Sequence, residues 1–261
     1  MEIGVQLFGC MGLYNKDPEA FLGSIAKAGF TQAEPCVSFG QIPGLEQFAW
    51  KAEEIGLHTA RLQKYGLSLS SCHVFAKDLP AALPAMIKTA AAAGIRQYVI
   101  GFHGPVNRES LLAFKETCMQ LSDALSTHGI ELWLHNGSAE IVSTLVDGVP
   151  AAQWLLEACG GRLGMQVDTG WVVYSGADLH AFMDSIAPYI RSVHHKDLRE
   201  IPPAGQMFVN TAIGDGIVDS AYACAFALEH HLGQIVDQDN SAGDMMEDLT
   251  RSVSFLQRMC E

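Results

Sequence analysis

The stretch LGMQVDTGWVVYSGADLHAFMDSIAPYIRSVHHKDL, residues 163–198, contains the unit from which the fold can be inferred. Its two ends, Leu163–Gly170 and Ser192–Leu198, are short apolar runs typical of strands that are buried on both faces. The segment Asp178–Ile190 between them has a helical pattern. A strand, a helix and a second strand in this order predict a parallel sheet.

The same alternation runs along all 261 residues. The predicted strands are Ile3–Gly9, Gln32–Val37, Ser68–Phe75, Gln97–His103, Glu131–Gly137, Leu163–Gly170, Ser192–Leu198 and Gly233–Asn240. Helical patterns cover Leu79–Ala93, Leu111–Thr127, Asp178–Ile190, Val218–His230 and Asp244–Cys260, and Asp17-Pro18-Glu19 marks a further helix start.

Eight such units in this length favour a closed (β/α)8 TIM barrel of the α/β class over an open doubly wound sheet. The glycine-rich dinucleotide fingerprint is missing after the first strand, where Gly9-Cys10-Met11-Gly12 does not fit it. No linker rich in proline, serine or glycine divides the chain. We therefore expect one TIM barrel domain over residues 1–261.

Composition excludes several classes of function. A net charge of -13 disfavours nucleic acid and anionic membrane surfaces as partners. Seven scattered cysteines without a Cys-x-x-Cys pair indicate reduced thiols, mostly core filler, in a cytoplasmic protein. We expect no signal peptide, because the first residues lack a basic region and include Glu2, and no uninterrupted apolar stretch is long enough to span a bilayer.

Polar side chains end several of the predicted strands. Asp168 ends the sixth strand, His194 lies near the end of the seventh, and Asp237 lies near the end of the eighth. Because the carboxyl ends of barrel strands form one ring, we expect these three side chains to lie together. Carboxylate and imidazole groups suit a hard or borderline divalent cation, so the sequence predicts a metal site. The alternative for Asp168 is a helix cap or a structural salt bridge.

Alternation along the seventh predicted strand determines which of its side chains can reach this site. His194 and Lys196 share one face of the strand, and His195 and Asp197 share the other. We expect His194 to be a ligand and Lys196 to hold a substrate oxygen or polarise a carbonyl. The alternatives are a satisfied core histidine and a salt bridge to an acid.

Other strand ends offer substrate contacts. We assign this role to His73, His103, His135 and Glu34, although each could instead make a structural hydrogen bond. The backbone amides of Gly214-Asp215-Gly216 could receive a phosphate or hydroxyl group, which is a weak signal because glycines are common in turns. Few basic residues lie near the predicted mouth, which favours an unphosphorylated substrate.

Taken in order, these residues resemble the xylose isomerase-like TIM barrel superfamily, which includes the sugar phosphate isomerase/epimerase family and AP endonuclease family 2. The resemblance covers nearly the whole chain. It rests on His135-Asn136 with Glu140 beyond it, Asp168, the His-x-Lys-Asp run 194–197, Gly214-Asp215-Gly216, and Asp237-Gln238-Asp239-Asn240-Ser241.

The resemblance implies one divalent cation, Mn2+ or Mg2+ in the first place and Co2+ or Zn2+ otherwise. Its ligands would be Glu140, Asp168, His194 and Asp237. Glu140 lies past the fifth strand in the βα loop and could reach back over the mouth, and the resemblance strengthens its case as a ligand. Two departures matter. Gly137 replaces the second histidine of a His-Asn-His run, and Asp237 stands where glutamate is usual, so its carboxylate reaches one methylene less far.

The resulting hypothesis is a metal-dependent sugar isomerase or epimerase that acts on a keto-sugar or polyol through an enediolate. Glu140 or Asp237 would remove the proton next to the carbonyl, and the other acid would return it. Lys196 and His194 would add positive charge near the developing oxyanion. The partner is a small molecule, and a homo-oligomer, of which dimers are the commonest, is compatible with the sequence.

Three alternatives remain open at this point. The same enediolate can expel a β-hydroxyl, which would make the protein an inosose-type dehydratase. A tri-zinc endonuclease for abasic DNA could use His73, His103, Glu140, Asp168 and His194, but that family needs a histidine where Trp171 stands. A non-catalytic barrel that serves as a partner subunit is the third alternative.

Overall fold

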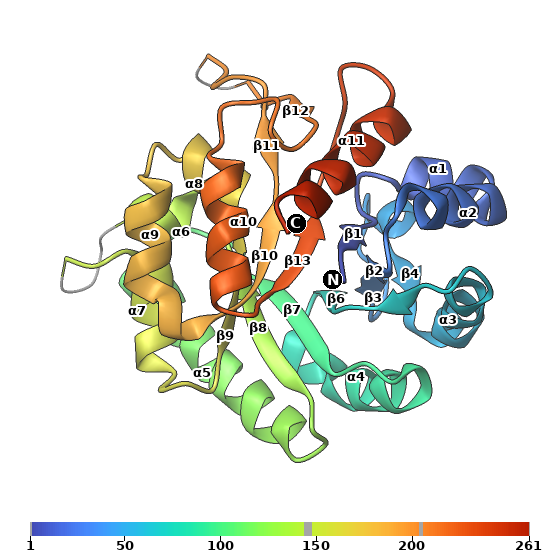
Figure 1. The fold of residues 1–261 in the computed structure, drawn as a ribbon. Helices are drawn as coiled ribbons and strands as arrows, with labels where there is room; N and C mark the ends of the chain where they lie inside the picture. The colour runs from blue at the N-terminus through green and yellow to red at the C-terminus, as the bar shows by residue number, and fades with distance from the viewer. Residues whose placement is uncertain (1, 144–147, 204–205, 261) are drawn as a thin grey trace.

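The computed structural model describes residues 2–143, 148–203 and 206–260. Within them, eleven strands form one sheet in the order β4-β3-β6-β7-β8-β9-β10-β13-β1-β2-β5, and every pairing in it is parallel (Figure 1). The strands are β1 (Gly4–Gln6), β2 (Gln32–Glu34), β3 (Cys36–Ser38), β4 (Trp50–Lys51), β5 (Ser68–Leu69), β6 (Cys72–Phe75), β7 (Gln97–Gly101), β8 (Glu131–His135), β9 (Gly164–Asp168), β10 (Ile190–His195) and β13 (Gly233–Val236). A separate antiparallel pair is formed by β11 (Asp197–Leu198) and β12 (Asn210–Thr211).

The sheet closes on itself because the second predicted strand pairs with the first on one side and with the third on the other. The second and third predicted strands are each split in two, so this closure is shared between their halves. β2 and β3 are separated by Pro35, which has no N–H to donate to the ladder. β2 pairs with β5, while β3 pairs with β6, the continuation of β5. The hydrogen-bonded order therefore returns from β13 through β1 to the second strand, and the eight predicted strands form a TIM barrel.

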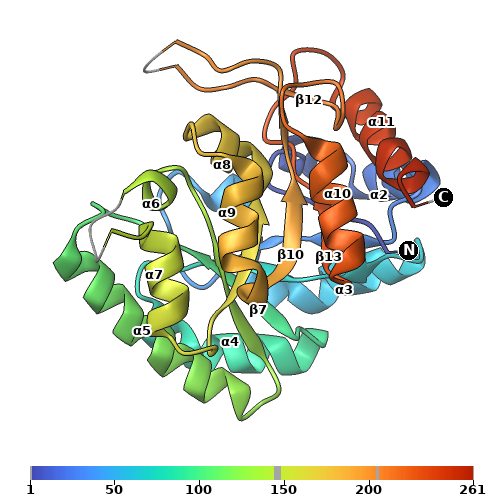
Figure 2. The ribbon, with the colours of Figure 1, turned by 60° about the vertical axis from the view of Figure 1, so that its left-hand side comes forward.

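Helices cover the outside of this barrel (Figures 1 and 2). They are α1 (Met11–Lys16), α2 (Pro18–Ala28), α3 (Ile55–Lys64), α4 (Leu79–Ala93), α5 (Arg108–Ser126), α6 (Ala139–Val142), α7 (Ala151–Ala158), α8 (Thr169–Tyr174), α9 (Leu179–Ile186), α10 (Ser220–Glu229) and α11 (Met245–Arg258). Short 3-10 turns lie at Glu46–Phe48, Ala52–Glu54 and Ala187–Tyr189. The last helix, α11, packs against α2, which joins the two ends of the chain.

Aspartate caps fix where many of these helices begin. The carboxylate of Asp17 accepts the backbone N–H of Ala20, and Pro18 takes the first helical position, as the sequence predicts. α4, α9, α10 and α11 begin in the same way, after Asp78, Asp178, Asp219 and Asp244.

Alternation along the strands separates two kinds of side chain. One set faces the helices and forms the hydrophobic core, for example Val5, Leu134, Val167, Val193 and Val236. The other set faces the barrel axis and is largely polar: Gln6, Glu34, His73, His135, Gln166 and His194. Six of the seven cysteines are buried, which agrees with the prediction that most are core filler.

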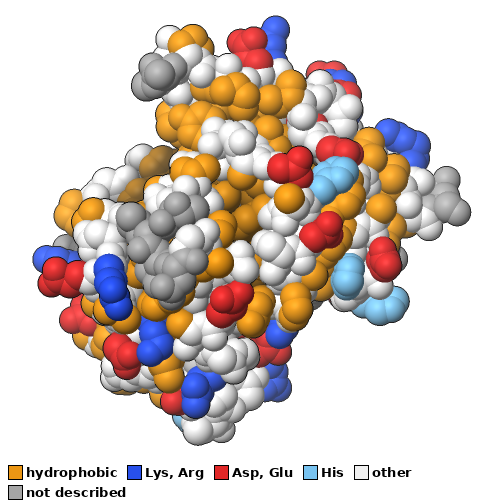
Figure 3. Space-filling model, turned by 90° about the vertical axis from the view of Figure 1, so that its left-hand side faces the viewer, with side chains coloured by type: hydrophobic (Ala, Val, Ile, Leu, Met, Phe, Trp, Pro, Cys, Tyr) orange, Lys and Arg blue, Asp and Glu red, His pale blue; other side chains and the backbone are white. Residues whose placement is uncertain are grey.

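Large exposed apolar side chains gather near the connection between β11 and β12. Ile201, Met207 and Val209 lie in or beside it, and Ile217 follows it. Figure 3 shows hydrophobic side chains concentrated in the upper part of the molecule, where Figure 2 places this connection. Because β11 follows β10 directly, the connection borders the carboxyl end of the barrel. No helix in the described ranges is long and apolar enough to cross a membrane.

Candidate functional site

A hydrogen-bonded network fills the barrel axis beneath the strand ends. Glu34 is fully buried, and its carboxylate accepts hydrogen bonds from Gln6 Nε2 (2.8 Å), Gln166 Nε2 (2.7 Å) and the Ser71 hydroxyl. The side-chain oxygen of Gln166 lies 2.8 Å from His73 Nε2 and 3.1 Å from His135 Nδ1. Buried polar groups need such partners, so this network fixes the orientation of both imidazoles.

His194 lies between two carboxylates in this network. Its Nε2 is 2.5 Å from Glu34 Oε2, and its Nδ1 is 3.0 Å from Asp237 Oδ2. Burial alone would lower the pKa of His194, but Glu34 and Asp237 outweigh burial and raise that pKa to about 10. His194 is therefore an imidazolium at neutral pH when no metal is bound.

Lys196 brings a second cation to the same point. Its Nζ lies 2.9 Å from Asp168 Oδ2, 3.0 Å from Asp237 Oδ2 and 2.8 Å from Asp239 Oδ2. Burial alone would lower its pKa, but these three carboxylates hold it well above the usual range. The ammonium group also lies 5.7 Å from the ring centroid of Trp171, within the range of a cation–π contact.

Four side chains here present metal-ligand atoms to a common point. His135, Asp168, His194 and Asp237 each offer an atom within 4.8 Å of the others, and His73, His135 and His194 form a second, overlapping group. Asp237 Oδ1 is buried without a hydrogen-bond partner among the described residues. A buried carboxylate oxygen without a donor is unfavourable, so this atom is available to a cation.

The balance of charge also favours a cation. Four carboxylates, those of Glu34, Asp168, Asp237 and Asp239, face two cationic side chains in this group, which leaves two negative charges in excess when all are ionised. Burial raises the pKa of Asp168, and Asp237 adds to this effect while Lys196 opposes it. Metal binding by His194 releases its proton and raises the excess to three, and a divalent cation would offset two of these charges, so the donor set fits the metal that the sequence predicts.

The fourth predicted ligand, Glu140, lies outside both groups. It is on α6, buried at 3% exposure, and its Oε1 accepts a hydrogen bond of 2.6 Å from Gly137 N. A Cβ atom at Gly137 would lie 3.6 Å from both carboxylate oxygens. Burial raises the pKa of Glu140, and the Gly137 amide opposes this shift. His135, predicted as a substrate contact, takes the place next to Asp168 instead, and metal binding by Glu140 stays a prediction.

Two further sequence predictions have different outcomes. His195 and Asp197 do face away from His194 and Lys196, since His195 Nε2 contacts Gln234 Oε1 at 3.1 Å behind the strand. His103, predicted to contact substrate, is exposed and lies beside an apolar pocket outside both metal-ligand groups.

The turn Gly214-Asp215-Gly216 is not an anion site in this structure. The N–H groups of Gly214 and Gly216 both donate to Asp197 Oδ2, at 2.9 and 3.1 Å. The suggestion that they receive a phosphate or hydroxyl group is therefore wrong, because a carboxylate of the chain already occupies them. Asp197 also accepts the N–H groups of Leu198 and Val218, so it holds the connection before α10 in place.

No role is predicted from the sequence for Gln6, Gln166 or Asp239. Each is a polar residue within or just after an apolar strand, on the face that points to the axis, and this parity is the signal that identifies them. The site pocket holds about 200 Å³ and is lined by Gln6, Phe8, Cys36, His73, Phe75, His135, Trp171, Lys196, Asp237 and Asp239.

No protein-family model matches the chain, and no curated protein matches its sequence. Solved structures match it over nearly the whole length. A sugar phosphate isomerase/epimerase from Parabacteroides distasonis is 17% identical, with a TM-score of 0.81 over 98% of this chain and 95% of that one. The chain therefore has a TIM barrel fold.

Two other structures share this fold. A xylose isomerase-like TIM barrel protein from Mycobacterium smegmatis, solved in complex with magnesium, is 16% identical, with a TM-score of 0.71 over 99% of this chain and 96% of that one. D-psicose 3-epimerase from Clostridium cellulolyticum, solved with D-tagatose, is 10% identical, with a TM-score of 0.69 over 100% of both chains. At these identities the likeness concerns the fold alone.

Proposed function

We propose that the protein is a divalent-metal-dependent isomerase or epimerase, which moves a proton next to the carbonyl of a keto-sugar or a related polyol. The observation that carries this proposal is the group His135, Asp168, His194 and Asp237, whose ligand atoms converge beside an excess of negative charge. The group lies at the carboxyl end of the barrel strands, where TIM barrel enzymes have their active sites.

His135, Asp168, His194 and Asp237 would hold the metal. Two imidazoles beside two carboxylates favour Mn2+ over Mg2+, which prefers oxygen ligands, and Co2+ and Zn2+ would also suit the set. A divalent cation bound there supplies a Lewis acid that polarises a carbonyl oxygen. Glu34 accepts the Nε2–H of His194, which leaves Nδ1 as the ligand atom once it has lost its proton.

Two carboxylates are suited to move the proton. Burial alone would raise the pKa of Asp237, but Lys196 and His194 hold it well below the usual range, so Asp237 is ionised at neutral pH and is the weaker base of the two. Glu140 has a raised pKa, which brings it closer to neutral pH, where proton exchange is most effective. We assign Asp237 and Glu140 as the two acid–base groups of the reaction.

The remaining side chains would bind the substrate. Lys196 places a fixed positive charge where an oxyanion develops as the proton leaves carbon. His73 lines the same pocket, and its ring is held by Gln166, so it can meet a substrate hydroxyl in a defined direction. The pocket volume, about 200 Å³, suits a small polar molecule.

The test is solvent deuterium uptake by NMR, with Mn2+-loaded protein and a panel of keto-sugars in D2O. We expect deuterium at a carbon next to the carbonyl, with loss of uptake in Glu140→Gln and no change in Glu109→Gln, an exposed glutamate of α5. Loss of water from the substrate would indicate a dehydratase instead. Nicking of abasic DNA would indicate the endonuclease, and absence of every reaction would favour a non-catalytic barrel.

A further inference from the structure

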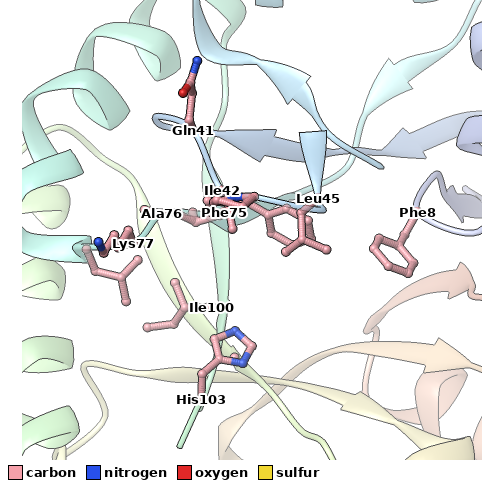
Figure 4. Close-up of a pocket in the computed structure, with 13 residues that line it drawn as sticks. Phe8, Gln41, Ile42, Leu45, Phe75, Ala76, Lys77, Ile100 and His103 are labelled. Atoms are coloured by element: carbon pink, nitrogen blue, oxygen red, sulfur yellow. The ribbon is translucent and has the colours of Figure 1, made fainter. Parts of the chain in front are cut away.

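A second pocket opens beside the site and differs from it in chemistry. It holds about 500 Å³, within the range of sites for drug-sized ligands. Its lining is largely apolar: Phe8, Ile42, Pro43, Leu45, Val74, Phe75, Ala76, Leu79, Ile100 and Gly101, with Gln41, Lys77 and His103 as the polar members. Figure 4 places Leu45 and Phe75 between Phe8 on one side and Lys77 on the other, with Ile100 and His103 across from them.

The two pockets share a wall. Phe8 and Phe75 line both the apolar pocket and the site pocket. Phe75 comes two residues after His73 on β6, and Phe8 comes two residues after Gln6, the last residue of β1. Because alternate residues of a strand face the same side, Phe75 lies one layer above His73, and Phe8, in the turn after β1, meets the Phe75 ring edge-on. A single molecule can therefore contact the network with one end and the apolar pocket with the other.

The walls of the second pocket are unsuited to a plain sugar. Ile42 and Leu45 come from the segment after β3, while Val74 and Ile100 come from β6 and β7, and none of these side chains can hydrogen-bond a hydroxyl group. Hydroxyl groups placed there would lose hydrogen bonds to water without replacement. An aromatic or aliphatic group placed there would instead gain from leaving water.

Aromatic side chains at the junction favour a flat apolar group. The Phe8 ring stacks on Phe48 at 4.8 Å between centroids and meets Phe75 edge-on at 6.2 Å. Such an arrangement offers ring faces and edges to a further ring. The polar members Gln41, Lys77 and His103 are exposed, so they sit at the rim of the apolar floor.

We infer that the substrate is a polyhydroxylated carbonyl compound that carries an apolar ring substituent, with the sugar part in the site pocket and the substituent in the pocket between Phe8 and Ile100. This inference rests on the proposed function for the sugar end and on the pocket itself for the apolar end. It predicts that a phenyl group on the sugar increases affinity.

Isothermal titration calorimetry on the Mn2+-loaded protein tests this with phenyl glycosides whose sugar ring retains a ketone, each against the methyl glycoside of the same keto-sugar. We expect phenyl glycosides to bind about tenfold or more tightly than their methyl counterparts, since a phenyl ring buries several carbons more than a methyl group does. Ile42→Asp should abolish this preference by placing a charge in the wall, and Ile42→Trp should abolish it by filling the pocket.

Leu57→Asp is the matched control, because Leu57 is an exposed residue of α3 outside the pocket lining. Equal affinity for phenyl and methyl glycosides across the panel would overturn the inference, as would phenol alone binding as tightly as the phenyl glycosides. Deuterium uptake without a phenyl preference would overturn this inference and leave the proposed function standing. A phenyl preference without any deuterium uptake would overturn the proposed function and leave the apolar pocket as a binding site.

Discussion

His194 donates its Nε2–H to Glu34 across 2.5 Å, although 160 residues separate the two in the sequence and both side chains are fully buried. Glu34 is the last residue of β2, and His194 comes from β10, with β13 and β1 between these two strands in the sheet. Burial alone would raise the pKa of Glu34, but His194 and His73 hold it well below the usual range. Glu34 is thus a permanent anion that orients His194 towards Asp237.

Glu34→Gln should weaken metal binding without removing a ligand. The amide keeps the shape of the side chain but loses the charge that orients His194, and partners of this kind typically account for a 10- to 100-fold difference in metal affinity. Calorimetric titration with Mn2+ measures the effect, with Glu53→Gln, an exposed glutamate before α3, as the control. Unchanged affinity in Glu34→Gln would show that His194 needs no such partner.

Gly170→Ala should disturb Lys196 and lower activity. A Cβ atom at Gly170 would lie 2.6 Å from Lys196 Cγ and 3.0 Å from its Cβ, closer than side chains approach. The ammonium group would then move away from Asp168 and Asp237. We expect the rate of deuterium uptake to fall about tenfold or more, as when one electrostatic contact in an active site is lost. Gly12→Ala is the control, since a Cβ there meets nothing within 4 Å, and equal rates in both variants would contradict the role of Lys196.

His58 should make stability depend on pH well away from the site. Its ring stacks on Trp50 at 4.4 Å, and Tyr14 hydrogen-bonds its Nδ1 at 2.6 Å. Burial, and then Arg61, lower its pKa from 6.5 to about 4, although Glu54 opposes this. Between these two values the unfolded chain binds more protons than the folded one. The free energy of unfolding therefore falls as the pH drops from 6.5 to 4, by roughly 1–3 kcal/mol.

Urea denaturation at several pH values measures this contribution. His58→Gln removes one titrating group, so it should reduce the pH dependence in this window by the share of His58, whereas His128→Gln, at an exposed position, should retain the full dependence. An equal slope in His58→Gln and the unmodified protein would mean that other groups cause the dependence.

Asp197→Ala should destabilise the fold. The Asp197 carboxylate accepts backbone N–H groups from Leu198, Gly214, Gly216 and Val218, at 2.9 to 3.1 Å. Removing it leaves several part-buried donors without a partner, at a cost of about 2–4 kcal/mol in the free energy of unfolding. Asp215→Ala, which loses only an exposed pair with Arg251, should cost far less, and similar midpoints for the two variants would contradict this account.

The sequence was sufficient for the barrel because its signal is local and repeated. Each apolar run ends in polar residues, and the bounds of α4, Leu79–Ala93, follow from its cap at Asp78 and its glycine at Gly94. Splits within strands were not predicted. Pro35 interrupts the second strand because it cannot donate a hydrogen bond, and this changes pairing without changing the hydrophobic pattern.

The site was only partly predictable, because it depends on side-chain direction across distant strands. Parity along the strands correctly separates His194 from His195 and groups Asp168, His194 and Asp237. It does not show that His135, rather than Glu140, joins this group, since Glu140 lies on a short helix whose path the pattern does not fix. The apolar pocket also escaped prediction, because its walls come from four separate segments.

Metal content is the most direct test of the central claim that His135, Asp168, His194 and Asp237 form a divalent metal site. The protein is loaded with Mn2+, desalted and measured by elemental analysis, beside Asp168→Asn and the control Asp123→Asn, which removes a carboxylate from an exposed pair with Arg162. We predict about one Mn2+ per chain in the unmodified protein and in Asp123→Asn, and loss of the ion in Asp168→Asn. Equal metal content in all three, or none in any, would contradict the claim.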